Sequence, residues 1–146
     1  MTREYREGAY LISTDRARLD VGAIHRFLAG SYWAKGIPLE VVRRSVENSL
    51  CFGLYAGAEQ VGFARVVTDY ATFAWLSDVF IAKPHRGRGL SKWLMECVRG
   101  HPGLQGIRRW TLVTADAHGL YGKSGFAPLK APERWMEIYD PDMYLK

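Results

Sequence analysis

The amino-acid sequence predicts a single mixed α/β domain, and three observations support this fold class. The chain has 146 residues, a length that suits one domain with one sizeable core. Strand-like and helix-like patterns follow one another in the order β α α β β β α β α β. No repeat, low-complexity segment or long linker interrupts that order, so we expect residues 1–146 to form one domain.

The first half of the chain predicts a strand, two helices and a β-hairpin. Asp20 is suited to cap a helix because the apolar residues that follow it recur on one helical face. Pro38 suits the first turn of a second helix, where a missing backbone N–H does no harm. Gly57 lies in a turn between two apolar runs, as in a β-hairpin. The expected elements are a strand at 10–14, helices after Asp20 and from Pro38, and hairpin strands at 49–55 and 61–69.

The second half predicts three more strands and two more helices. Apolar residues from Leu90 to Val98 recur at helical spacing and form one stripe, which predicts an amphipathic helix. Gly125 suits the end of a short helix. The expected elements are strands at 72–81, 107–115 and 134–139, a helix from Leu90, and a short helix within 117–126.

Positive charge is concentrated in one part of the chain. The net charge is +5, and residues 83–109 carry seven Lys or Arg residues against one acidic residue, Glu96. A local positive field of this kind is typical of a polyanion site rather than of a generally basic surface. The heavy aromatic load and the 48% hydrophobic content exclude a disordered chain.

The cysteines and the lack of long apolar segments bear on the compartment. Cys51 and Cys97 each lie among apolar residues, as buried free thiols do in a reducing compartment. The first ten residues contain no apolar signal segment, and no run of 18 apolar residues occurs. We therefore expect a cytoplasmic protein with no membrane partner.

The stretch KPHRGRGLSKWLM, residues 83–95, is the strongest functional pattern. Its segment Arg86–Gly89 follows an apolar strand and leads directly into a helix. The N-terminus of a helix presents free backbone N–H groups that bind phosphate, and glycines let the backbone approach the ligand. Arg86 and Arg88 would add charge-assisted hydrogen bonds. The alternative is a solvated charged turn, because the stretch is neither a Walker A loop nor a complete dinucleotide fingerprint.

This stretch resembles the acetyl-CoA signature R/Q-x-x-G-x-G/A of the GNAT family of N-acetyltransferases, with Arg86, Gly89 and Ser91 at the fixed positions. Serine departs from the family's glycine or alanine but is small enough for close approach to a pyrophosphate. Residues 117–126, AHGLYGKSGF, are similar to the family's A-x-x-L-Y-x-x-x-G-F segment. The predicted element order also matches, so the resemblance spans most of the chain.

The resemblance implies a mixed, mostly antiparallel central sheet flanked by about four helices. It also implies an acetyl-CoA-dependent N-acetyltransferase, an acyltransferase that moves the acetyl group directly to an amine without a metal. The strand end at 79–81 would lie beside the pantetheine arm and thioester, and the glycine loop would hold the pyrophosphate. The implied acetyl-CoA-binding residues are Val79, Phe80, Ile81, Arg86, Gly87, Arg88, Gly89, Leu90, Ser91 and Lys92.

Two residues are expected to carry the catalytic proton transfers. The resemblance places Tyr121 at the position of the family's general acid, which protonates the departing thiolate; the alternative is a tyrosine that only packs against the cofactor. Asp78 lies on the strand beside the thioester, where family members often carry a base, and its alternative is local backbone hydrogen bonding. Asp69 and His118 are weaker candidates for the base.

The acceptor site is expected at the connection between the first two helices, SYWAKGIP, which forms one wall of the substrate site in the family. Tyr32 and Trp33 could stack on an acceptor, and Trp75 could line the opposite wall. Each of these aromatics has the alternative of an ordinary surface or core role. The short chain favours a small-molecule amine whose identity the sequence does not specify.

Two rival functions follow from the same features. A CoA-binding regulator of the same fold would keep the glycine loop without turnover. A basic nucleic-acid-binding module would use the positive stretch, but no RNP, KH, zinc-ligand or homeodomain pattern is present. We therefore expect no nucleic-acid partner, and the sequence leaves both a monomer and a homodimer open.

Overall fold

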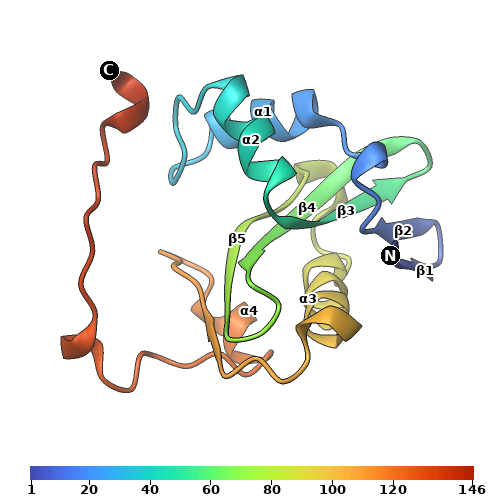
Figure 1. The fold of residues 1–146 in the computed structure, drawn as a ribbon. Coiled ribbons are helices and arrows are strands. Elements are labelled where there is room, and N and C mark those ends of the chain that lie inside the picture. Colours follow the sequence, from blue (N-terminus) through green and yellow to red (C-terminus); the bar gives the residue numbers. More distant parts are fainter.

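The computed structural model describes residues 1–146 and shows a six-stranded sheet with helices on both faces (Figure 1). The strands lie in the sheet in their chain order. They are β1 (Glu4–Glu7), β2 (Tyr10–Ser13), β3 (Leu50–Ala56), β4 (Glu59–Thr68), β5 (Phe73–Ile81) and β6 (Arg109–Thr111). The helices are α1 (Val21–Ala29), α2 (Leu39–Glu47), α3 (Leu90–Gly100) and α4 (His118–Gly122). The predicted α/β class is confirmed.

Strands β1 to β5 pair antiparallel, and β5 pairs with β6 in parallel. The parallel pair is possible because α3 crosses over between the two strands. It covers only three residue pairs, from Phe73–Arg109 to Trp75–Thr111. The sheet is therefore mixed and mostly antiparallel, as the resemblance implied.

Two apolar clusters hold the helices against the two faces of the sheet. On one face, α1 and α2 bury Ile24, Leu28, Val42 and Val46 against Phe63 and Phe80. On the other face, the stripe of α3 packs onto alternate residues of β3, β4 and β5, including Phe52, Leu54 and Leu76. Strand alternation explains this division, because neighbouring residues of a strand point to opposite faces.

Local sequence signals set the helix boundaries. The Asp20 carboxylate accepts a hydrogen bond from the Ala23 backbone N–H at 3.0 Å, which confirms the predicted cap. Pro38 takes the cap position itself, one residue before α2 begins. Gly89 is the cap residue of α3 and has a left-handed φ of +75°.

The cysteines behave as predicted. Cys51 and Cys97 are free and buried. Burial raises the pKa of the Cys51 thiol to about 12 and that of Cys97 to about 11. Both side chains therefore remain neutral thiols within the core at neutral pH.

Three expectations about strands need correction. The polar strand β1 was not predicted, because it is recognised only through its pairing with β2. The predicted strand at 107–115 is ordered as a strand only over β6. The predicted strand at 134–139 is wrong: a 3-10 turn, Pro132–Arg134, leads into a segment without a strand partner. In Figure 1 this last segment runs apart from the sheet and ends beside the connection between α1 and α2.

The helices of this fold are short. The longest, α3, has 11 residues, and none of the helices has the length and apolar character needed to cross a membrane.

Candidate active site

An irregularity in β5 lies at the centre of the candidate site. Phe63 pairs with Phe80 and Arg65 pairs with Ser77, so two residues of β5, 78 and 79, lie opposite one residue of β4. Such a bulge re-aims the side chain and backbone groups of the extra residue. Asp78 has a φ of +54°, a left-handed conformation that aspartate adopts more readily than most residues.

The sheet opens next to this bulge. The pairing of β5 with β6 ends at Trp75 and Thr111, so residues 77–81 have no strand on that side. Backbone N–H and C=O groups in such a position need another partner. An extended ligand with its own amide groups is suited to this gap between the two strands.

The glycine loop follows directly from β5. A short 3-10 turn, Lys83–His85, precedes it, and α3 begins at Leu90. Gly87 and Gly89 both have left-handed φ angles, +79° and +75°, which disfavour any side chain. A Cβ at either position would meet no protein atom within 4 Å, so both face open space.

A cavity of about 200 Å³ lies over this loop and the N-terminus of α3. It contains most of the predicted pyrophosphate-binding residues, but Arg88 is exposed and does not line it. Because it combines free N–H groups at a helix start with basic side chains, the cavity is suited to phosphate. Its lining residues are Ile81, His85, Arg86, Gly87, Gly89, Leu90, Ser91, Lys92 and Leu120.

Arg86 has a structural role in the loop as well as a charge. Its Nε donates a hydrogen bond to the Ile81 carbonyl at 2.8 Å, which ties the loop back to the end of β5. His85 is held from the opposite side by a 2.9 Å hydrogen bond between its Nδ1 and the Tyr10 hydroxyl. Sequence reasoning missed His85 as a lining residue, although it lies within the stretch that was singled out.

A second cavity, of about 130 Å³, adjoins the first through Lys92 and Leu120. Residues of α3 and of the segment after α4 line it, including Arg99 and Lys123. Three basic side chains and one acidic side chain, Glu96, thus line one hollow, which leaves an excess of positive charge. Sequence reasoning assigned only Lys92 to the cofactor site. It did not bring Arg99 and Lys123 to that site, because α3 and α4 meet only in the folded chain.

The strand end at 79–81 divides its side chains between the two faces. The Phe80 ring stacks on Phe27 with 3.8 Å between the centroids, within the α1 and α2 cluster. Val79 packs against the other cluster, and Ile81 lines the first cavity. Phe80 can therefore reach a ligand in the gap only through its backbone.

Tyr121 lies on α4, next to the cavity-lining Leu120. Its ring makes an edge-on contact with Phe126, with 6.1 Å between the centroids. Burial raises the pKa of the Tyr121 phenol to about 12, and the neighbouring Tyr32 and Asp116 add to the effect. The phenol therefore stays protonated at neutral pH.

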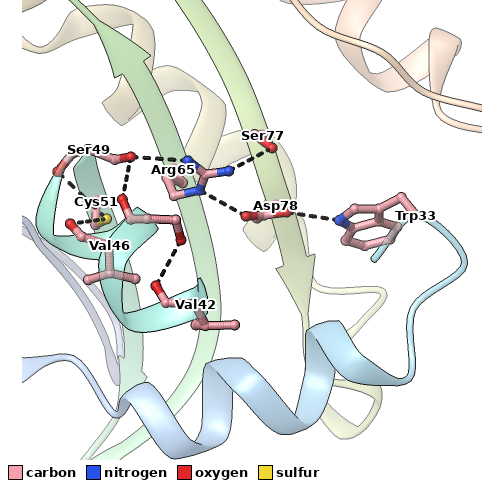
Figure 2. A network of polar contacts seen from close by, with 9 residues as sticks. Trp33, Val42, Val46, Ser49, Cys51, Arg65, Ser77 and Asp78 are labelled. Atoms are coloured by element: carbon pink, nitrogen blue, oxygen red, sulfur yellow. Dashed lines mark hydrogen bonds and ion pairs between the residues drawn. The ribbon is translucent and has the colours of Figure 1, made fainter. Parts of the chain in front are cut away.

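Asp78 is the centre of a polar network, shown in Figure 2. One carboxylate oxygen accepts a hydrogen bond from Arg65 Nε at 2.8 Å, and the other accepts one from Trp33 Nε1 at 2.9 Å. The side chains of Arg65 and Asp78 are only 14% and 9% exposed. Arg65 also donates to the hydroxyls of Ser49 and Ser77, at 3.1 and 3.4 Å. Because both oxygens of Asp78 are engaged, its assignment as a base stays a prediction that competes with a positioning role.

The connection between α1 and α2 bridges the gap between β5 and β6. Trp33 ties it to β5 through Asp78, and the Tyr32 hydroxyl accepts a hydrogen bond from the Ala115 backbone N–H at 3.1 Å. Tyr32, Trp33 and Trp75 are 61%, 39% and 42% exposed, so all three aromatics remain free to contact an acceptor.

The two weaker candidates for the base are Asp69, in the turn between β4 and β5, and His118, on α4. The Asp69 carboxylate accepts hydrogen bonds from Thr72, Ala71 and Phe73 within its own turn. The bonds from Thr72, followed by that from Ala71, hold the pKa of Asp69 well below its usual range, so it is occupied in shaping the turn. His118 is the first residue of α4.

A mixed sheet that opens beside a glycine loop at a helix start is the architecture that the acetyltransferase resemblance implied. The family model described as the acetyltransferase (GNAT) domain matches residues 47–128, which is more than half of the chain. The protein belongs to the GNAT acetyltransferase family.

Relatives agree with this assignment. A Gibberella zeae protein that carries an acetyltransferase name is 34% identical over 145 residues, which covers 84% of this chain and 81% of that protein. A crystal structure of a Xanthomonas campestris protein assigned to the GNAT family has 51% identity and a TM-score of 0.93, and the match covers 97% of this chain and 100% of that one. A Clostridium acetobutylicum protein solved with acetyl-CoA shares the fold, with 13% identity, a TM-score of 0.62 and coverage of 95% and 96%.

Proposed function

We propose that this protein is an acetyl-CoA-dependent N-acetyltransferase that moves the acetyl group directly to the amine of a small molecule. One observation carries the proposal. The cavity at the glycine loop, which is suited to phosphate, lies at the end of β5. The gap between β5 and β6, the bulge at Asp78 and the exposed rings of the acceptor wall follow along the same strand. A phosphate-bearing thioester and an amine could therefore meet at one point.

The residues present fit acetyl-CoA. The open space at Gly87 and Gly89 is the close-approach surface that a pyrophosphate needs, and Lys92 supplies charge beside it. CoA also carries a phosphate on its ribose, and the second cavity with Arg99 and Lys123 would accept it. The relative solved with acetyl-CoA supports the same choice of ligand.

Acetyl-CoA supplies a thioester carbonyl that an amine can attack. The residues of this chain would orient that carbonyl and stabilise the charge that develops on its oxygen and on the departing sulfur. Backbone N–H groups turned out of the ladder by the bulge at 78–79 are suited to polarise the carbonyl oxygen. Tyr121 holds a proton at its phenol oxygen and would pass it to the departing sulfur. Because burial raises the pKa of Tyr121 to about 12 and so weakens it as an acid, this transfer requires the phenol to lie directly beside the sulfur.

The acceptor side of the site favours an amine with an apolar or aromatic body. Tyr32, Trp33 and Trp75 offer exposed rings, on which a ring or a cation can stack. Asp78 fixes the Trp33 ring by accepting its Nε1–H, while Arg65 balances the charge of the carboxylate. We also propose a cytoplasmic location, because a reducing compartment suits two buried free thiols.

The test has two readouts on the purified protein. Calorimetric titration measures acetyl-CoA binding, and release of free thiol measures transfer across a panel of primary amines. Binding together with amine-dependent thiol release is expected. Binding without release on any amine would instead identify the non-catalytic CoA-binding regulator, and the absence of binding would overturn the proposal altogether.

A further inference from the structure

Arg65, on β4, is a largely buried charged residue that no step of the proposed reaction uses. It lies on the strand that pairs with β5 at the bulge. Burial of a guanidinium is costly unless its N–H groups find partners. The Arg65 guanidinium bonds Asp78 and Ser77 of β5 and also Ser49, which lies between α2 and β3 (Figure 2). One side chain thus joins three segments beside the candidate site.

Ser49 gives the Arg65 guanidinium a fixed point of attachment. Ser49 is buried, and its hydroxyl donates a hydrogen bond to the Ser45 carbonyl of α2 at 2.7 Å. The carbonyl of Ser49 accepts a hydrogen bond from Arg16 at 3.2 Å. The hydroxyl oxygen is therefore held in place where it accepts from Arg65 Nη1 at 3.1 Å. Because a guanidinium is planar and rigid, this contact also fixes the direction of Nε, which donates to Asp78.

The Asp78 carboxylate transmits this orientation to Trp33. One carboxylate oxygen accepts from Arg65 Nε at 2.8 Å, and the other accepts from Trp33 Nε1 at 2.9 Å (Figure 2). A carboxylate that is bonded at both oxygens cannot rotate without breaking one of these bonds. Tyr32 and Phe27 also contact the indole, with 5.1 and 6.2 Å between the ring centroids. The Trp33 ring is therefore held in one orientation while part of it stays open to solvent.

We propose that Arg65 is a positioning residue that sets how tightly the acceptor amine binds, through Asp78 and Trp33. This role rests on the proposed function, in which the Trp33 ring contacts the acceptor. Stacking and cation–π contacts depend on the angle and distance between the ring and its ligand. A displacement of about 1 Å in a group that positions a substrate can lower activity about a hundredfold. In this role Asp78 orients an aromatic side chain rather than accepting a proton from the amine.

The first experiment follows the Trp33 indole N–H by heteronuclear NMR of the full chain. The chain has five tryptophans, and the indole signal that disappears in Trp33→Phe belongs to Trp33. Arg65→Lys keeps a positive charge beside Asp78 but cannot bond Asp78 and Ser49 at the same time. We expect it to speed solvent exchange of the Trp33 indole N–H by about tenfold or more. Arg16→Lys is the matched control, because Arg16 bonds Ser49 and not Asp78, and exchange at Trp33 should be unchanged.

The second experiment connects the indole to the acceptor without requiring turnover. Benzylamine, a primary amine with an aromatic body, is titrated onto protein saturated with CoA, and its dissociation constant is measured from backbone amide shifts. Arg65→Lys is expected to raise that constant by about fivefold or more, with CoA affinity unchanged. In a Trp33→Phe background, which already lacks the N–H, the same substitution should weaken benzylamine no further, since both residues act through one path.

The outcomes separate a positioning role from a purely structural one and from the proposed function. A structural Arg65 predicts the same added loss of benzylamine affinity in both backgrounds, and that result would overturn the proposal. Unchanged indole exchange in Arg65→Lys would also overturn it, as would a wild-type protein that does not bind benzylamine. Failure of thiol release with every amine would remove the proposed function but would leave these exchange and binding results as they stand.

Discussion

Replacing Asp78 with Asn isolates the contribution of the polar network behind the acceptor wall. The Asp78→Asn change keeps the side-chain shape and tolerates the left-handed φ of +54°, so it removes charge rather than space. Arg65, only 14% exposed, would be left with a buried guanidinium and no counter-ion. Breaking a buried pair from one side typically costs about 3–5 kcal/mol of unfolding free energy.

The low end of that range is expected here. The Asn amide oxygen still accepts one hydrogen bond, and Ser49 and Ser77 still accept from Arg65. A loss of about 3 kcal/mol in a domain of this size lowers the Tm by about 6–12 °C. Differential scanning calorimetry at pH 7 measures this shift.

An exposed ion pair provides the control. Arg43 and Glu40 lie 2.9 Å apart with side chains 48% and 69% exposed, so Glu40→Gln is expected to cost less than about 1 kcal/mol. Equal Tm shifts in the Asp78 and Glu40 variants would refute the argument that burial gives the network its strength.

Three other predictions concern the glycine loop, the proposed general acid Tyr121 and the pH dependence of stability. Gly89→Val is expected to weaken acetyl-CoA binding more than tenfold, about 1.4 kcal/mol, by calorimetry; Gly106→Val, with a similar φ of +77° outside the loop, controls for backbone strain and should bind normally. Tyr121→Phe is expected to lower kcat about 10²–10⁴-fold with acetyl-CoA affinity nearly unchanged, and a fall of less than threefold would remove Tyr121 from the mechanism. Burial, with Arg3 and the N-terminal amine, lowers the pKa of His101, so its neutral form is the one that the fold favours. The contribution of neutral His101 to stability is therefore complete above its unfolded-state pKa of about 6.5 and is lost as the pH falls below that value. We expect the Tm of the His101→Gln variant to fall less between pH 7.5 and 5 than the Tm of the wild type.

Features made by consecutive residues could be predicted from the sequence. The glycine loop is one such feature, because its φ angles, its helix start and its charges all lie within residues 83–95. The Asp20 cap is another, since the carboxylate and the N–H it accepts are three residues apart. In both cases local chemistry decides the conformation.

Features that depend on distant residues could not be predicted. The β5 bulge depends on its register against β4, and the bond between Trp33 and Asp78 joins residues 45 positions apart. The segment 134–139 has the composition of a strand, but composition does not supply the neighbouring strand that makes one. The basic hollow between Lys92, Arg99 and Lys123 likewise exists only where α3 and α4 meet.

The short ladder between β5 and β6 makes the two parts of the domain unequal in local stability. Three residue pairs hold β6 to the sheet, whereas seven hold β3 to β4. Segments with few cooperative hydrogen bonds open by small fluctuations long before the whole molecule unfolds. The amides of β6 and α4 are therefore expected to exchange with deuterium well before those of β3 and β4. Entry of a ligand into the gap between β5 and β6 then requires only local opening of the C-terminal third of the chain, while β1 to β5 stay paired.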